Sequence, residues 1–181
     1  MTLKHGQCLV VVLATCCCLA TRARSQDFAP AGNLVGITNV HEKISVALNL
    51  KGADEFRLDS QKITALVRDT LNAAGVGTNG SGIGTPMVSA SISGESTGGG
   101  GARYTVEVLV RATTPSPFAK NRSVEAIFWR GIASGEEVER YDPASKSFIK
   151  PSGPINERVY GSVREVAARL AADLKKANAV K

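Results

Sequence analysis

Residues 103–112 read RYTVEVLVRA and alternate between two kinds of side chain. One set is apolar and consists of Tyr104, Val106, Val108, Val110 and Ala112. The other set is mostly polar and consists of Arg103, Thr105, Glu107, Leu109 and Arg111. Because successive side chains of a strand point to opposite faces of a sheet, this period of two predicts a strand with one buried face.

Further strands are predicted on both sides of this segment. Alternation is strict over 44–51 and shorter over 87–93 and 124–129, where Val124, Ala126 and Phe128 oppose Trp129. The pair Ser134-Gly135 is expected to turn the chain into a weaker strand at 137–141. Glycine-rich and proline-rich connections between the later strands favour antiparallel pairing.

Two segments have the period of an amphipathic helix. Asp59 is the expected N-cap of the first, and Gly75 is its expected left-handed end. Its apolar positions are Ile63, Leu66, Val67, Leu71 and Ala74. The second helix follows the prolines at 151–154, and its stripe consists of Val159, Val163, Val166, Leu170 and Leu174.

The resulting element order is β-α-β-β-β-(β)-α. Strands with one apolar face and two amphipathic helices predict an α+β fold, a two-layer sandwich. We expect a mainly antiparallel sheet of four to five strands, covered on one face by the two helices. Residues 1–25 are expected to be a signal peptide, 26–39 an extended lead-in, and 40–181 a single α+β domain.

The first 25 residues have the pattern of a secretory signal. Lys4 precedes an apolar run over 8–20, and small residues follow it, which predicts cleavage near Ala23 or Ser25. The run is shorter than the roughly 20 apolar residues of a spanning helix. An uncleaved anchor and lipidation at Cys16 are the alternatives, although Thr15 is unusual before a lipidated cysteine.

Removal of this segment determines much of the remaining chemistry. All four cysteines lie within it, so the mature domain would be cysteine-free, without disulfides or thiol chemistry. Lys4, Arg22 and Arg24 also leave with it, so 19 basic and 16 acidic residues remain. This balance and the nine aromatic residues do not predict nucleic-acid binding.

Two glycine-rich segments do not carry nucleotide chemistry. Gly75, Gly77 and Gly80 match a dinucleotide-binding spacing, but that site requires a preceding strand and a following helix. Here a predicted helix precedes the glycines and a predicted strand follows them. We therefore interpret 75–86 as a connecting loop and 94–101 as a loose hairpin tip.

No catalytic, cofactor or metal site is predicted. His41 is the sole histidine after the signal, and nucleophilic catalysis needs a base beside the nucleophile. The acidic residues Glu136, Glu137 and Glu139 are expected to lie along a solvated hairpin edge. Asn79 and Asn121 begin glycosylation sequons whose use depends on the host.

One loop has the composition of a partner-binding segment. Phe118 lies between prolines and close to Lys120 and Arg122, which suits an ordered contact site. The alternative is that Phe118 folds back onto the core.

In element order, residues 40–178 resemble the LPS-assembly lipoprotein family and related small envelope proteins of Gram-negative bacteria. No motif is shared, so no site residue is carried over. The resemblance implies an exported, periplasmic or secreted, non-enzymatic protein that binds another envelope protein or lipid-linked component. Two alternatives are a small secreted hydrolase with an unrecognised acid pair and a structural surface protein that pairs through an edge strand.

Overall fold

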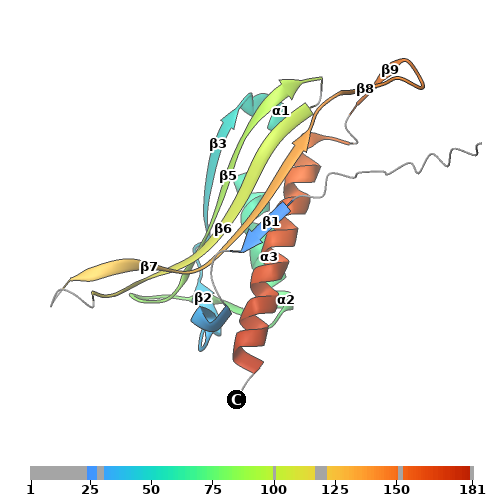
Figure 1. The fold of residues 1–181 in the computed structure, drawn as a ribbon. Coiled ribbons are helices and arrows are strands. Elements are labelled where there is room, and N and C mark those ends of the chain that lie inside the picture. Colours follow the sequence, from blue (N-terminus) through green and yellow to red (C-terminus); the bar gives the residue numbers. More distant parts are fainter. Residues whose placement is uncertain (1–23, 28–30, 100, 117–121, 151–152, 180–181) are drawn as a thin grey trace, which may run out of the picture.

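The chain forms a sheet with two helices packed on one of its faces (Figure 1). A computed structural model describes residues 24–27, 31–99, 101–116, 122–150 and 153–179. Within these ranges, the main sheet has five strands in the order β1-β7-β6-β5-β3. Their bounds are Arg24–Asp27 for β1, Ser45–Lys51 for β3, Met87–Gly98 for β5, Gly101–Pro115 for β6 and Ser123–Glu137 for β7.

The sheet is mixed, with a single parallel pair among its described strands. β3 runs parallel to β5, whereas β5, β6, β7 and β1 pair antiparallel. A parallel pair needs a crossover connection, and helix α2 (Ser60–Ala73) lies in that connection. The shorter elements are η1 (Ala31–Leu34), β2 (Asn39–His41), α1 (Ala53–Phe56), β4 (Gly77–Gly80), β8 (Arg140–Asp142) and β9 (Ser147–Ile149).

Helix α2 begins and ends where its sequence predicts. The Asp59 carboxylate accepts hydrogen bonds from the backbone N–H groups of Gln61 at 2.7 Å and Lys62 at 3.4 Å. These bonds satisfy donors that have no partner inside the first turn. Gly75 follows the helix with a φ of 83°, a left-handed conformation that glycine adopts without steric cost.

The long helix α3 (Ile155–Ala179) packs along the sheet beside α2. All five residues of its predicted apolar stripe are fully buried: Val159, Val163, Val166, Leu170 and Leu174. Tyr160 links α3 to the start of α2, because its hydroxyl accepts a hydrogen bond from the backbone N–H of the N-cap residue Asp59 at 2.9 Å. The Lys62 Nζ lies 4.0 Å from the centroid of the same ring.

The apolar side of β6 faces these helices and forms the centre of the core. Its buried members are Ala102, Tyr104, Val106, Val108, Val110 and Ala112. The prediction of an α+β two-layer sandwich, with a mainly antiparallel sheet covered on one face by two helices, is therefore confirmed.

The hairpin formed by β5 and β6 is longer than the sequence predicts. Residues 94–96, predicted as part of a loose tip, pair with β6, and the pairing extends to Gly98 and Gly101. Strand β7 continues through Ser134-Gly135, so the predicted turn there is wrong. The separate strand predicted over 137–141 is found as β8, with its bounds shifted to Arg140–Asp142. Gly135 has a packing role instead, because it lies opposite Tyr104 and beneath that ring.

Two segments predicted as irregular contain regular structure. Residues 77–80 form β4, which pairs parallel to β2 beside the main sheet. The lead-in predicted as extended over 26–39 contains the turn of 3-10 helix η1, and Leu34 at its end is fully buried. The apolar contacts of Leu34 thus hold part of this segment in a compact conformation.

A bulge changes the orientation of side chains in the middle of β7. Val110 pairs with Trp129 whereas the next residue, Arg111, pairs with Ile127, so Phe128 is an extra residue in β7. An extra residue reverses which side chains face the core. Trp129 is consequently fully buried, although plain alternation assigns it the face opposite Phe128. Its indole Nε1 donates to Asp173 Oδ2 of α3 at 2.9 Å.

Candidate functional site

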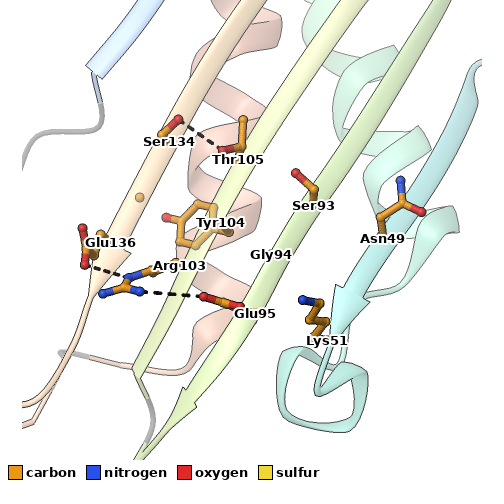
Figure 2. A pocket seen from close by; sticks show the side chains of 11 residues that line it. Asn49, Lys51, Ser93, Gly94, Glu95, Arg103, Tyr104, Thr105, Ser134 and Glu136 are labelled. Carbon is orange, nitrogen blue, oxygen red and sulfur yellow. Dashed lines mark hydrogen bonds and ion pairs between the residues drawn. The ribbon is translucent and has the colours of Figure 1, made fainter.

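The face of the sheet opposite the helices carries polar side chains in cross-strand rows (Figure 2). Pairing sets Lys51 beside Glu95, Glu95 beside Arg103, and Arg103 beside Glu136. Four strands thus contribute one row of alternating sign, which we call the charged row. Since side chains alternate along each strand, the next row on the same face lies two residues away. This hydroxyl row consists of Asn49, Ser93, Thr105 and Ser134.

Arg103 is the centre of the charged row. Its Nε lies 2.8 Å from Glu136 Oε1, and its Nη1 lies 3.8 Å from Glu95 Oε1. The hydrogen bond and charge of Glu136, followed by the charge of Glu95, raise the pKa of Arg103 above its ordinary value. Arg103 is therefore a fixed cation held between carboxylates from two neighbouring strands.

The two rows border a shallow groove of about 490 Å³. In the hydroxyl row, the Thr105 and Ser134 hydroxyl oxygens are 3.3 Å apart. Beneath the groove, Tyr104 lies between Gly94 and Gly135 of the neighbouring strands and points to the core. Its hydroxyl is 3.3 Å from Ser162 Oγ of α3. Packing on the core side therefore holds the strands that present the polar side chains.

The arrangement offers hydrogen-bond donors and acceptors together with charges of both signs. The groove combines a guanidinium, an ammonium, two carboxylates, hydroxyls and an amide. Across the residues that the structure describes, no group of three or more His, Cys, Asp or Glu side chains could hold a metal ion. Among the same residues, no helix has the length and apolar character needed to cross a bilayer. Recognition of a polar surface is the chemistry that such a groove supports.

Comparison with known proteins finds distant structural likeness only. No protein-family model matches the chain, and no curated protein does. The PelC dodecamer from Paraburkholderia phytofirmans is 11% identical, with a TM-score of 0.48 over 84% of this chain and 97% of that chain. A point variant of the same dodecamer gives a TM-score of 0.47 at the same identity and coverage.

A weaker likeness is to the rare lipoprotein B from Shewanella oneidensis. It is 15% identical, with a TM-score of 0.24 over 73% of this chain and 91% of that chain. This protein is a weak structural neighbour that shares no family model and no motif with the chain.

The described part of the predicted partner loop lies apart from the groove. Phe118 and Lys120 fall outside the described residues. Arg122 is exposed just before β7, and its carbonyl accepts from the Ser116 N–H at 2.7 Å. It is at the far end of the β6–β7 hairpin from Arg103, since Pro115 pairs with Ser123 there.

The residues considered for catalysis are separated by the fold. His41 lies in β2, and its Nδ1 accepts from the Lys43 N–H at 3.0 Å. Glu136 belongs to the charged row, whereas Glu137 reaches Arg158 of α3 at 2.8 Å. Glu139 lies against Gly99 at the β5–β6 tip. The three glutamates thus have three different environments, and only Glu136 is at the groove.

The remaining sequence-based expectations concern processing and modification. Ala23 and Cys16 lie outside the described residues, whereas Ser25 belongs to β1 and pairs with Ala133. Of the two sequon asparagines, Asn79 is exposed in β4 and Asn121 is outside the described residues.

The charged row is not visible in the sequence because it depends on the strand register. Lys51 and Glu95 are 44 positions apart, and no local pattern connects them. The available signal was the polar set that includes Arg103, Thr105 and Glu107 on a strand with a strictly apolar opposite face. Such a strand predicts one polar sheet face, but not which residues become neighbours across it.

Proposed function

We propose that the mature chain is an exported, non-enzymatic accessory protein that binds another component of the cell envelope. The binding surface is the open face of the sheet, centred on Arg103. The observation that supports this proposal most directly is the charged row. In it, Arg103 Nε lies 2.8 Å from Glu136 Oε1 and Arg103 Nη1 lies 3.8 Å from Glu95 Oε1. Export is inferred from the signal pattern at the start of the sequence.

Preorganisation supports a binding role for this face. Its polar groups come from hydrogen-bonded strands, whose positions are set by Tyr104 and the helices behind them. A partner that meets such a face does not have to order a loop, so less conformational entropy is lost on association. Alternating charges within one row also favour a partner with a complementary polar pattern over a purely apolar one.

The hydrolase alternative receives less support from the geometry. A glycosidase of the usual kind needs two carboxyl groups that flank one bond. Glu136 and Glu137 are adjacent in β7 and therefore point to opposite faces of the sheet. These two members of the glutamate cluster therefore do not flank one bond.

A specific observation favours a second candidate, pairing through an edge strand. β3 is the outermost strand on one side of the sheet, and Leu48 on it is 36% exposed. A groove beside it is lined by Leu48, Leu50, Ala53, Asp54, Arg57 and Leu58. A partner strand added to β3 would place side chains along that groove.

The main test is charge reversal at the groove with a matched control. Arg103→Glu sets a third carboxylate beside Glu95 and Glu136, and we expect it to lower partner capture by roughly ten-fold or more. Arg164→Glu, an exposed position of α3, is the control and should bind as the wild type does. Capture is measured by crosslinking in the native cell from a photoreactive residue at Thr105.

Two outcomes would contradict the assignment to the open face. One is equal loss of capture in the Arg103→Glu and Arg164→Glu proteins. The other is loss on Leu48→Lys alone, because a lysine on an edge strand disfavours added pairing and would identify β3 as the interface. Because the substituted side chains are exposed, each variant should fold as the wild type does. Circular dichroism checks the fold of each variant.

Export is tested separately by mass spectrometry of the mature protein. We expect the mass of a chain that begins at Arg24, after cleavage behind Ala23, or at Gln26, after cleavage behind Ser25. Cleavage after Ala23 would retain all four residues of β1, which pairs with β7 over Arg24–Asp27. A mature protein that begins at Met1 would contradict the proposal.

A further inference from the structure

A small hairpin projects from the body of the molecule. Strands β8 and β9 contact chiefly each other, and Figure 1 shows them extending away from the sheet and helices. Arg140 pairs with Ile149, Tyr141 with Phe148 and Asp142 with Ser147, so residues 143–146 form the tip. A segment held mainly by its own pairing contributes little to the core. Core packing therefore does not account for the apolar residues of this hairpin.

Its exposed side chains are unusually apolar for such a position. Tyr141 is 56% exposed, Phe148 is 63% exposed and Ile149 is 56% exposed. The two aromatic rings stack edge to face, with centroids 5.5 Å apart and an interplanar angle of 63°. This pairing fixes the rings relative to each other but leaves more than half of each side chain in water. Grouped exposed apolar residues on a projection indicate a contact surface.

Basic residues surround the aromatic pair. Arg140, Lys146 and Lys150 are exposed along the hairpin. The acidic member, Asp142, is engaged in the tip: it accepts from Ser145 Oγ at 2.6 Å and from the Ala144 N–H at 3.0 Å. These bonds, with the Ser145 hydroxyl first, lower the pKa of Asp142. The Asp142 carboxylate therefore stabilises the turn of the hairpin through these hydrogen bonds.

Lys146 occupies a position that normally favours glycine. Its φ is 49°, in the left-handed region that most L-residues avoid. The backbone of the tip would be relaxed by glycine or asparagine here. The sequence instead places a cation at the tip.

We propose that the β8–β9 hairpin docks on an anionic lipid surface, with Tyr141 and Phe148 in the interfacial region and Lys146 and Lys150 among the headgroups. Aromatic side chains favour the boundary between headgroups and acyl chains. Nearby cations add attraction to acidic lipids, and the two contributions together are what reversible membrane binding requires. A protein partner is disfavoured as the occupant, because the hairpin offers a narrow projecting tip and lacks the broad surface of a stable protein interface.

This docking is independent of the proposed open-face site. The hairpin lies beyond the end of β7, and none of its residues lines the groove around Arg103. Failure of one proposal therefore leaves the other testable.

The test is cosedimentation of the full mature chain with vesicles. Vesicles of phosphatidylcholine mixed with phosphatidylglycerol should retain the protein, whereas phosphatidylcholine alone should retain much less. Each hairpin lysine contributes roughly five-fold to binding at an anionic surface, so Lys146→Gln with Lys150→Gln should weaken it about 25-fold. Tyr141→Ser with Phe148→Ser should weaken binding to the mixed vesicles by about ten-fold or more.

Matched substitutions outside the hairpin distinguish docking by the hairpin from nonspecific binding through net charge or exposed apolar surface. Ile83→Ser removes an apolar side chain that is fully exposed in the loop before β5, and binding should not change. Lys175→Gln with Lys176→Gln removes two cations near the end of α3, and binding should again not change. Lys146→Gly relaxes the tip, so it should preserve or raise thermal stability while lowering vesicle binding.

Three results would overturn the proposal. One is a wild-type chain that does not bind the mixed vesicles. Another is retention that falls equally in the hairpin variants and in the Lys175→Gln, Lys176→Gln control. The third is loss of a captured protein partner on Tyr141→Ser with Phe148→Ser, with vesicle binding unchanged, which would make the hairpin a protein-binding element.

Discussion

Replacing Trp129 by alanine is expected to lower the free energy of unfolding by about 4 kcal/mol. The side chain is fully buried between the sheet and α3, and its indole ring also covers Gly131 of the same strand. Removal leaves a cavity that the surrounding β-strands and helix cannot close fully. It also deprives Asp173 of the indole N–H, which lies 2.9 Å from its carboxylate. Urea unfolding monitored by circular dichroism measures the change.

Two controls assign the loss at Trp129 to burial. Trp129→Phe keeps an aromatic ring but removes the donor to Asp173, so we expect roughly half of the loss. Phe148→Ala removes an aromatic that is 63% exposed, and we expect a change within about 0.5 kcal/mol. Equal effects of Trp129→Ala and Phe148→Ala would mean that Trp129 does not face the core. Because the chain has one tryptophan, blue-shifted native emission that moves to longer wavelength on unfolding is an additional check.

The strongest periodic segments could be predicted from the sequence because their environment is uniform. The alternate positions of 104–112 that begin with Tyr104 all face the helices, and the stripe of α3 faces the sheet along its whole length. Burial on a single side then gives one unbroken period. Asp59 and Gly75 could be placed for a similar reason, since each satisfies a local backbone requirement at a helix end.

Trp129 and Ser134-Gly135 could not be predicted because their roles depend on a neighbouring strand. The bulge at Phe128 reverses the alternation, and it is visible only as a shift in pairing with β6. Gly135 has the signature of a turn in the sequence, yet it is required because Tyr104 occupies the space of its missing side chain. The charged row escapes prediction for the same reason, because it is a consequence of register and not of local pattern.

Replacing Gly135 by valine is expected to lower the free energy of unfolding by about 3 kcal/mol. A Cβ at this position would lie 2.4 Å from Cζ and 2.6 Å from the hydroxyl oxygen of Tyr104. The ring cannot move away easily, because Tyr104 is buried and its hydroxyl lies 3.3 Å from Ser162 Oγ of α3. The strain would reach Ser134 and Glu136, so capture at the open face should fall together with stability.

A double-mutant cycle and a second glycine isolate the role of Tyr104 in this loss. With Tyr104→Ala present, Gly135→Val should be less harmful than in the wild type by at least about 1 kcal/mol, since the clash is gone. Gly161→Ala in α3 meets no atom within 4 Å, and it should raise stability by about 0.5 to 1 kcal/mol through helix propensity. Additive effects of Gly135→Val and Tyr104→Ala would show that the aromatic ring does not restrict this glycine. The packing beneath the groove would then have to be assigned to other residues.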